Sequence, residues 1–430
     1  MKITNLHIEK YKHLENLEFD FTYQSGEKKG QPLEKICFIG QSATGKTNLL
    51  ELISNCLKYI LEIEIIENKY ISFNSQNITK VNFTLDIENK KLSYINNTIN
   101  YRNQTFTNNS NGGLVTSLIN FKDKKEVIYI KSNIISDHNI NFYSLSPLEI
   151  SDNLTNDEIK EKQKILNYYK TTSHMTFDNK VEVEVWLYLL SEILNYRKKF
   201  NQKMTELIYK GLLADTKKLQ KEFENWQIEN PNELKLLADK LNPLLEKLHL
   251  EVDTINAEYS IPIKRKNSDE VIAIQNTSTG TKGLLLSFLP LYKLKERESV
   301  VLIDEPERSL YPDIQIDLMD NYRNISPNSQ FIIATHSPFI AAAFEPDERF
   351  ILYFDEEGNV KVRRGSAPIG DDPNDILSND FGLESLLNKT GQEIYDDYLN
   401  KKNQVLFEED SEKKKALLKE IEQIGDKYDF

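Results

Sequence analysis

The chain has 430 residues, which is enough for two or three domains. Apolar residues make up 39% and charged residues 28%, so a sizeable core is expected and bulk disorder is excluded. The net charge is -13, which excludes a surface that binds nucleic acid everywhere but allows a local basic groove. With two cysteines and no signal peptide or membrane-length apolar run, the sequence predicts a cytoplasmic protein without a membrane partner.

Short strands dominate the first part of the chain. Leu17, Phe19 and Phe21 alternate with polar residues, and 36–39 is a continuous apolar run typical of a buried parallel strand. A glycine-rich turn and a helix from Thr47 to Leu61 follow. Meander strands between 81 and 102, a loop at 108–113 and a strand at 127–130 complete a predicted first lobe over residues 1–155.

The middle of the chain changes to a helical pattern over residues 156–249, with Val181 to Tyr209 as the longest predicted helix. Strands return in 250–365, including apolar runs at 300–303 and 331–334 and a hairpin at 350–362. Residues 366–430 are helical and highly charged. The sequence therefore predicts an α/β core split by a helical insertion and followed by a helical C-terminal region.

The turn before the helix at 47–61 carries the pattern Gly-x-x-x-x-Gly-Lys-Thr. Its glycines allow backbone N–H groups to face phosphate oxygens, and the helix N-terminus adds the positive end of its dipole. Lys46 can reach the β and γ phosphates, and the Thr47 hydroxyl can hold Mg²⁺. The predicted nucleotide-binding residues are Gly40, Gln41, Ser42, Ala43, Thr44, Gly45, Lys46, Thr47 and Asn48.

Two carboxylates, Asp304 and Glu305, end the apolar run at 300–303, where parallel sheets bind ligands. We expect Asp304 to join Thr47 as a Mg²⁺ ligand and Glu305 to polarise the water that attacks the γ-phosphate. Alone, this pattern fits a solvated acidic turn equally well. The phosphate loop elsewhere in the chain favours the catalytic interpretation.

Two further segments are candidates for nucleotide contact. His336 follows the strand at 331–334, where an imidazole can hydrogen-bond a γ-phosphate oxygen, although structural histidines are commoner. Ser278 and Gly280 open the helix at 284–294 in a run of small residues that forms either an anion cradle or an ordinary helix cap. With Lys46 and Glu305, His336 completes the predicted catalytic set.

The order of these four segments resembles an ABC-type ATPase head of the SMC/RecF-like branch, across both predicted lobes. The segment Glu307–Pro312 resembles that branch's dimer-contact loop. The resemblance implies ATP and Mg²⁺ as cofactors, slow ATP hydrolysis and a homodimer around the nucleotide. In such a dimer, Ser278 and Gly280 of one subunit would contact the γ-phosphate held by Lys46 of the other.

The sequence departs from this family at two places. Thr277 and Thr281 occupy the outer positions of the small-residue signature, although its central residues remain. Where the family has a glutamine that links Mg²⁺ to the insertion, this chain reads Lys-Ser-Asn at 131–133, so Ser132, Asn133 or another residue takes that role. Lys12 resembles a basic residue near the phosphates of this branch, and a solvated lysine is the alternative.

The compact insertion and charged C-terminal helices resemble bacterial antiphage ATPases, such as the PtuA subunit of Septu and retron systems and the AriA subunit of PARIS. This resemblance implies a sensor or scaffold subunit that controls a separate nuclease or toxin chain, in a dimer or a higher oligomer. A RecF-like DNA repair ATPase is the alternative; a transporter subunit is disfavoured by the interrupted lobes. DNA contact would use basic runs at 197–199, 264–266 or 361–364. The C-terminal helices either pack on the head or form a docking surface.

Overall fold

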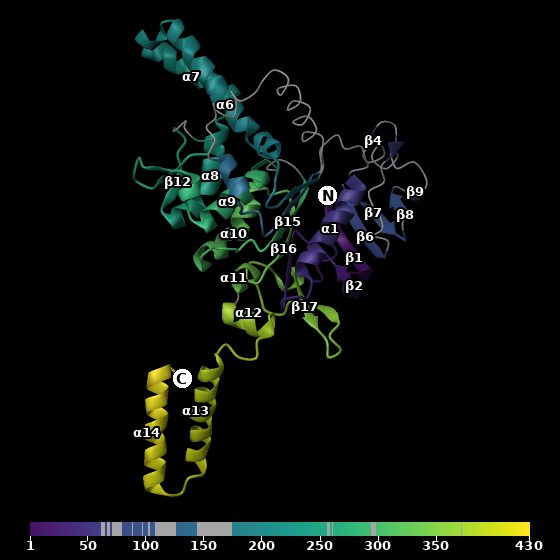
Figure 1. The fold of residues 1–430 in the computed structure, drawn as a ribbon, viewed down its shortest axis with the longest axis vertical. Helices are drawn as coiled ribbons and strands as arrows, with labels where there is room; N and C mark the ends of the chain where they lie inside the picture. Colours follow the sequence, from purple (N-terminus) through teal and green to yellow (C-terminus); the bar gives the residue numbers. More distant parts are fainter. Residues whose placement is uncertain are drawn as a thin grey trace.

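The structure is a computed structural model, which describes residues 1–61, 65–66, 69–70, 80–87, 89–96, 98–101, 104–107, 126–143, 174–255, 259, 261–293, 298–370 and 372–430. Two large sheets with helices form a head, and a helical hairpin projects from each of two opposite ends of it (Figure 1). The predicted loop at 108–113 lies outside the described residues.

A seven-stranded sheet forms the centre of the head, in the order β11-β10-β15-β16-β3-β17-β18. Each neighbouring pair is parallel except β17 and β18. Its strands are β3 (Lys35–Gly40), β10 (Glu126–Ile130), β11 (His174–Phe177), β15 (Ser299–Asp304), β16 (Gln330–Ala334), β17 (Arg349–Phe354) and β18 (Val360–Arg364). Because β3, β15 and β16 are parallel neighbours or next neighbours, the three motifs that follow them meet at one edge.

Strand β11 differs from the sequence prediction, because it lies inside the segment 156–249 that was predicted to be a helical insertion. It pairs in parallel with β10, so the first described part of that segment belongs to the core sheet. Four residues are too few to reveal a period in the sequence. The buried ring of His174 lies 2.8 Å from the Ser54 hydroxyl, and burial lowers the pKa of His174 to about 3.

One face of the central sheet is covered by helix α1 (Lys46–Leu61) and by a six-stranded antiparallel sheet, which share one hydrophobic cluster with it. That second sheet has the order β2-β1-β6-β7-β8-β9. Its strands are β1 (Lys2–Tyr11), β2 (Leu14–Asp20), β6 (Val81–Ile87), β7 (Lys90–Ile95), β8 (Thr98–Tyr101) and β9 (Gln104–Thr107). These strands confirm the predicted meander and the alternating N-terminal pattern.

Helices cover the other face of the central sheet around a second hydrophobic cluster. They are α3 (Asp137–Tyr143), α6 (Val183–Tyr209), α8 (Glu233–Leu245), α9 (Thr279–Lys293), α10 (Pro312–Ile325), α11 (Pro338–Ala341) and α12 (Pro373–Asn379). Small sheets are formed by β4 (Ile65–Ile66) with β5 (Lys69–Tyr70), and by β12 (Leu250–Val252), β13 (Ile263–Arg265) and β14 (Val271–Ile272). Among the described residues, no helix is both long and apolar enough to cross a membrane.

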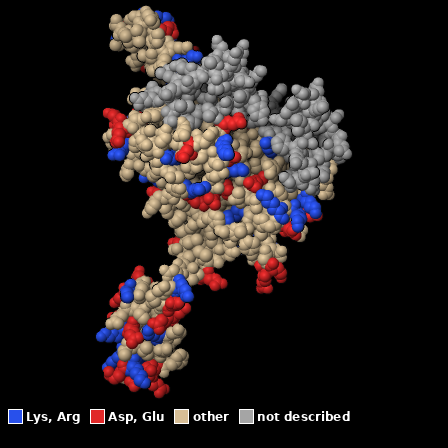
Figure 2. Space-filling view, viewed as in Figure 1, with Lys and Arg blue, Asp and Glu red and all other residues tan. Residues whose placement is uncertain are grey.

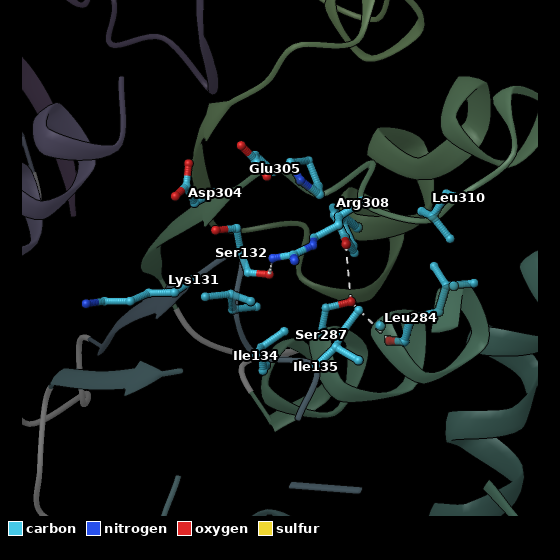
Figure 3. A pocket seen from close by; sticks show the side chains of 15 residues that line it. Lys131, Ser132, Ile134, Ile135, Leu284, Ser287, Asp304, Glu305, Arg308 and Leu310 are labelled. Carbon is cyan, nitrogen blue, oxygen red and sulfur yellow. Dashed lines mark hydrogen bonds between the residues drawn. The ribbon is translucent and has the colours of Figure 1, made fainter. Parts of the chain in front are cut away.

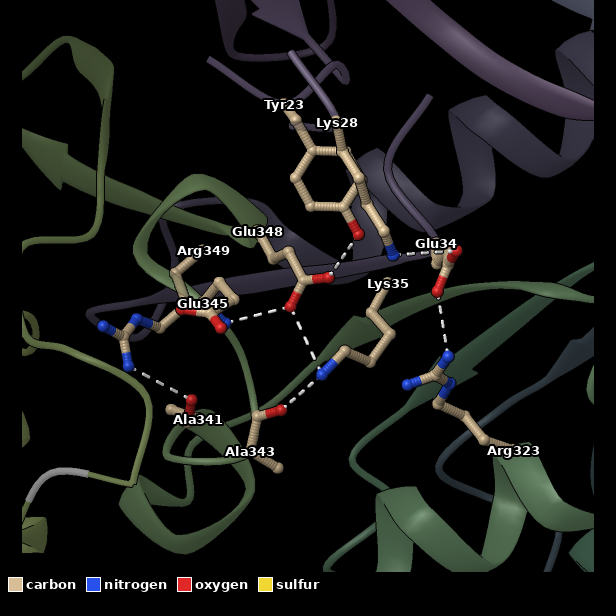
Figure 4. Close-up of polar contacts among 10 residues, drawn as sticks. All are labelled: Tyr23, Lys28, Glu34, Lys35, Arg323, Ala341, Ala343, Glu345, Glu348 and Arg349. Atoms are coloured by element: carbon tan, nitrogen blue, oxygen red, sulfur yellow. Dashed lines mark hydrogen bonds and ion pairs between the residues drawn. The ribbon is translucent and has the colours of Figure 1, made fainter. Parts of the chain in front are cut away.

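Buried polar contacts join the two ends of the head sequence (Figure 4). The Lys35 ammonium lies 3.3 Å from the Glu348 carboxylate and donates to the Ala343 carbonyl at 2.6 Å, while the Tyr23 hydroxyl donates to Glu348 at 3.1 Å. A buried charge is tolerated only where it is paired and hydrogen-bonded. These contacts therefore hold the N-terminal strands and the β17 region in one unit.

The head extends past residue 365, where the sequence predicts the C-terminal region to begin. Ala367 and Ile376 are buried in the cluster of the helical face, and Asp380 is fully buried 2.9 Å from Arg349. Beyond them, α13 (Lys389–Phe407) and α14 (Ser411–Tyr428) form a hairpin that stands apart from the head (Figure 1). A second hairpin, formed by the distal half of α6 and by α7 (Thr216–Glu229), projects at the opposite end.

Candidate nucleotide-binding and catalytic site

The loop between β3 and α1 has a backbone that requires glycine at two positions. Gly40 has φ +144°, and a Cβ there would lie 2.0 Å from the Leu352 carbonyl oxygen. Gly45 has φ +93°, and a Cβ would lie 2.7 Å from His13 Nε2. Between them, Ala43 also adopts a left-handed conformation, at φ +67°. The loop thus has the tight, inward-turned geometry that anion-binding backbone nests require.

Lys46 begins α1 and is only 6% exposed. Its ammonium donates hydrogen bonds to the carbonyl oxygens of Gly40 at 2.9 Å and Gln41 at 3.1 Å. Burial lowers the pKa of Lys46, and the charges of Asp304 and Glu305 oppose this effect. Lys46 therefore closes its own loop, a structural role that the sequence pattern does not reveal.

The Thr47 hydroxyl and the Asp304 carboxylate are brought together from the first and second motifs. Thr47 Oγ1 donates to Asp304 Oδ1 at 3.2 Å and Oδ2 at 3.0 Å. Burial, with Glu305 and Glu307 nearby, raises the pKa of Asp304 to about 6, although the Thr47 hydrogen bond opposes the shift. A hydroxyl and a carboxylate are oxygen ligands suited to Mg²⁺, and this crowding of carboxylates fits a site that accepts a cation.

Replacing Asp304 with asparagine is expected to stabilise the nucleotide-free protein at pH 8. Folding raises the pKa of Asp304 from 3.8 to about 6, so the protonated carboxyl group stabilises the folded state. This contribution to the free energy of unfolding is fully present below pH 4 and is lost as pH rises through about 6. The gain should be roughly 2–3 kcal/mol at pH 8 and shrink towards pH 4. Urea unfolding in EDTA at both pH values measures it, with the exposed Asp239→Asn as control. An equal gain at both pH values would contradict this ionisation.

Glu305 and Glu307 follow Asp304 in a strained turn. Glu305 has φ +50°, which is unusual for a residue with a side chain, and its N–H donates to the Ala334 carbonyl at 2.8 Å. The Glu307 carboxylate is largely buried in this turn, and its Oε1 accepts the His336 N–H at 2.8 Å. Backbone strain of this kind concentrates at functional sites. The turn thus connects the second motif to the third.

The sequence analysis assigned Glu307 only to a dimer-contact loop. It did not predict that the Glu307 carboxylate is largely buried beside His336. Burial raises its pKa, although hydrogen bonds from His336 and Thr335 oppose the shift. The available signal was a second glutamate directly after Pro306. Desolvation and the nearby Lys46 charge lower the pKa of His336, which favours a neutral imidazole whose ring N–H can donate to a phosphate oxygen.

Two lysines lie beside the second turn of α1. Lys12 donates to Asn48 Oδ1 at 2.6 Å and to Glu51 Oε2 at 3.0 Å, and Lys131 lies 3.7 Å from Glu51 Oε1. The N-terminal strands, the strand β10 and the phosphate-loop helix therefore meet at Glu51. The Lys12 side chain is 47% exposed, and its ammonium lies next to the predicted nucleotide-binding residue Asn48.

A small pocket separates the start of α9 from the carboxylate turn (Figure 3). Gly280 and Gly283 of α9 line this pocket together with Asp304 and Glu305. A Cβ at Gly280 would lie 2.5 Å from the Ser309 carbonyl oxygen, so the signature glycine is required by a close approach within the chain. Ser278 is exposed, and its hydroxyl accepts the Thr281 N–H at 3.2 Å. The structure thus has Ser278 at an accessible helix N-terminus.

The segment after β10 is tied to the carboxylate turn through its backbone. Arg308 Nη1 donates to the Ser132 carbonyl at 2.7 Å, as Figure 3 shows. Lys131 and Ser132 line the same pocket as Asp304. Of the residues considered for the family's coupling glutamine, Ser132 therefore has a direct connection to the loop after the second motif.

Comparison with known proteins agrees with these observations. Residues 1–341 match the family described as the AAA ATPase domain. The chain is 23% identical over 435 residues to the Retron Vc95 probable ATPase of Vibrio cholerae serotype O1 biovar El Tor, covering 88% of this chain and 78% of that protein. It is 35% identical over 72 residues to the Septu protein PtuA of Bacillus thuringiensis, covering 17% and 18% of the two chains.

Among solved structures, an Smc head bound to the C-terminal winged-helix domain of ScpA matches 85% of this chain and 98% of that chain, at 13% identity and a TM-score of 0.43. The SMC head domain from Thermotoga maritima matches at 11% identity and a TM-score of 0.39. The expected resemblance to antiphage ATPases is confirmed by the sequence relatives. The family match over residues 1–341 covers most of the chain and includes all the motifs described above. The chain therefore belongs to the AAA ATPase domain family.

Proposed function

We propose that this chain hydrolyses ATP at the edge of the central sheet. The observation that carries the proposal is the hydrogen bond between Thr47 and Asp304, which joins two motifs 257 residues apart beside Lys46. In this assignment, Lys46 binds the β and γ phosphates, and Thr47 and Asp304 hold Mg²⁺, which neutralises phosphate charge when bound. Glu305 polarises the attacking water, and His336 contacts the γ-phosphate.

The proposed active form is a homodimer in which each nucleotide lies between two subunits. Lys46 of one subunit would hold the phosphates, and Ser278 of the other would approach the γ-phosphate. The accessible position of Ser278 at the N-terminus of α9 supports this assignment, because free N–H groups there favour an anion. Among the described residues, the hydrogen bonds of the Ser278 hydroxyl stay within its own helix.

Mixing two inactive variants tests the shared site. Lys46→Ala should fail to hold the phosphates, and Ser278→Arg should block the partner's nucleotide, so neither alone should hydrolyse ATP. In a mixed dimer, one of the two sites keeps both Lys46 and Ser278. Phosphate release should then recover to roughly a quarter of the wild-type rate, because half of the dimers are mixed and each has one intact site. Two inactive variants that stay inactive when mixed would place the complete site within one chain.

The relation to retron and Septu ATPases supports a role in antiphage defence. We infer that the chain is a sensor or scaffold subunit whose ATP-dependent state controls a separate nuclease or toxin chain. Support comes from the retron relative, which is similar over most of the chain and not only over the phosphate loop. Co-expression with the product of an adjacent gene, followed by purification with and without ATP, tests this role.

The hairpin α13–α14 is the proposed surface for assembly or effector docking. Among the described residues, its hydrogen bonds and ion pairs stay within the segment after residue 384, so the head does not cover it. Charged side chains of both signs are interspersed over it (Figure 2). Leu406 and Phe407 at its distal end are 73% and 83% exposed. Such apolar side chains at one end of a charged hairpin favour a protein contact.

Deleting residues 388–430 is expected to leave ATP turnover within about twofold of wild type, because surface contacts this sparse contribute little to the head. Higher assembly or effector binding should be lost, as measured by mass and co-purification. The pair Leu406→Ser and Phe407→Ser should have the same effect, and Ile228→Ser on the other hairpin should not. An insoluble or inactive head would instead assign the hairpin to packing on the head.

A further inference from the structure

Two of the three basic runs considered above for DNA contact are engaged by polar contacts within the fold. In the run at 264–266, each side chain lies within 3.7 Å of a glutamate carboxylate. In the run at 361–364, Lys361 lies 3.5 Å from Asp355 and Arg363 lies 3.8 Å from Asp380. Arg364 donates to the backbone carbonyls of Asp20 and Asp347. Every lysine and arginine in these two runs therefore has a polar partner within the fold.

The third run begins a larger basic region on the α6–α7 hairpin. Residues 196–221 contain eight lysines and arginines and two acidic residues, a net charge of +6 in a chain of -13. Five of these lysines are exposed and, among the described residues, have no ion pair within 4 Å: Lys198, Lys199, Lys217, Lys218 and Lys221. The acidic residues pair elsewhere, since Glu206 contacts Lys203 and Lys210 and Asp215 caps α7. The charge of these five lysines is therefore available to a partner.

The hairpin that carries these lysines is firmly attached to the head. The proximal part of α6, including Trp186 and Ile193, is buried in the core cluster of the helical face. Farther out, Phe200 packs against Phe223 and Trp226, with ring centroids 6.0 and 6.1 Å apart. At about 1.5 Å per residue, the 27 residues of α6 span about 40 Å. The basic region is thus held out from the head on a packed two-helix arm.

We propose that the tip of this arm, residues 198–221, binds the phosphate backbone of double-stranded DNA without reading its sequence. Unpaired lysines on a convex helical surface fit a strongly charged backbone. Single-strand binding needs a groove lined by several aromatic rings, whereas this tip exposes Tyr209 alone among its aromatic side chains. The tip also exposes the apolar side chains of Ile208, Tyr209 and Leu213, which a protein partner with an acidic surface would contact. The net charge of +6 over residues 196–221 favours the phosphate backbone, and binding of an acidic protein without duplex binding would overturn the proposal. This inference goes beyond the proposed ATPase function and does not rest on it.

Fluorescence anisotropy with a labelled 30-base-pair duplex at 50–200 mM salt tests the proposal. The wild-type affinity should fall steeply with salt, by a logarithmic slope of about 0.9 for each phosphate contact. The triple variant Lys217→Glu, Lys218→Glu and Lys221→Glu should lose at least tenfold in affinity at 50 mM salt and reduce that slope by about 3. The milder variant with glutamine at these three positions should change both quantities in the same direction.

A matched control carries Lys413→Glu, Lys414→Glu and Lys415→Glu on α14, which changes the net charge by the same amount. The proposal requires that this control binds DNA like the wild type and that all variants keep wild-type melting temperature and ATP turnover. If both triple variants weakened DNA binding equally, the loss would follow from net charge alone, and the proposal would be overturned. Absence of salt-dependent duplex binding, or binding only to a single strand and loss of it in Tyr209→Ala, would also overturn it.

Discussion

Replacing Glu305 with glutamine is expected to slow ATP hydrolysis by roughly 100- to 10,000-fold while leaving ATP affinity unchanged. The amide keeps the size of the carboxylate but cannot accept a proton from the attacking water. The turn that carries Glu305 should survive, because it is held by a backbone hydrogen bond to Ala334 and not by the side chain. Single-turnover phosphate release measures the chemical step. Size-exclusion chromatography should show a longer-lived ATP-bound dimer.

Glu307→Gln is the matched control for this variant, since it changes a neighbouring carboxylate in the same turn. Its amide oxygen can still accept the His336 N–H, so the contact between the second and third motifs should persist. We expect the Glu307 variant to lose much less activity than the Glu305 variant. Wild-type turnover in Glu305→Gln, together with a large loss in Glu307→Gln, would move the role of general base to Glu307.

Replacing Lys46 with alanine is expected to lower ATP affinity roughly 10- to 100-fold, the value of one or two hydrogen bonds to a charged group. Turnover should fall to background, because the γ-phosphate loses its main neutralising charge. Isothermal titration with ATP and steady-state phosphate release measure the two effects. Unchanged affinity and turnover would remove the proposed nucleotide site.

The Lys46 variant needs a control for folding, because its ammonium also closes the phosphate loop through two carbonyl oxygens. The loss of these contacts should lower the melting temperature slightly without unfolding the head. Lys235 is exposed on α8, so Lys235→Ala provides the reference melting temperature for a lysine whose removal should not affect the fold. A melting curve with a single native transition in Lys46→Ala would assign its inactivity to the lost phosphate contact.

The central sheet was predictable because its strands are continuous apolar runs, each followed directly by a motif. The runs ending at Ile39, Ile303 and Ala334 become β3, β15 and β16, and parallel pairing brings their carboxyl ends to one edge. Strand β11 escaped prediction, since four residues within a helical context carry no periodic signal. The burial of Ala367 and Ile376 on the head was equally invisible in a segment of helical composition.

The sequence by itself determined which residues form the candidate site, because the proposed phosphate and Mg²⁺ contacts need particular side chains at fixed spacing from a strand end. Tertiary structure alone decided which charges are free. Lys264 and Lys198 look alike in the sequence, yet Lys264 lies 3.2 Å from Glu251 while Lys198 is exposed on the arm. The inward turn of Glu307 likewise depends on a distant strand that supplies the His336 N–H. Ion pairs and burial arise from residues far apart in the chain, so local pattern cannot reveal them.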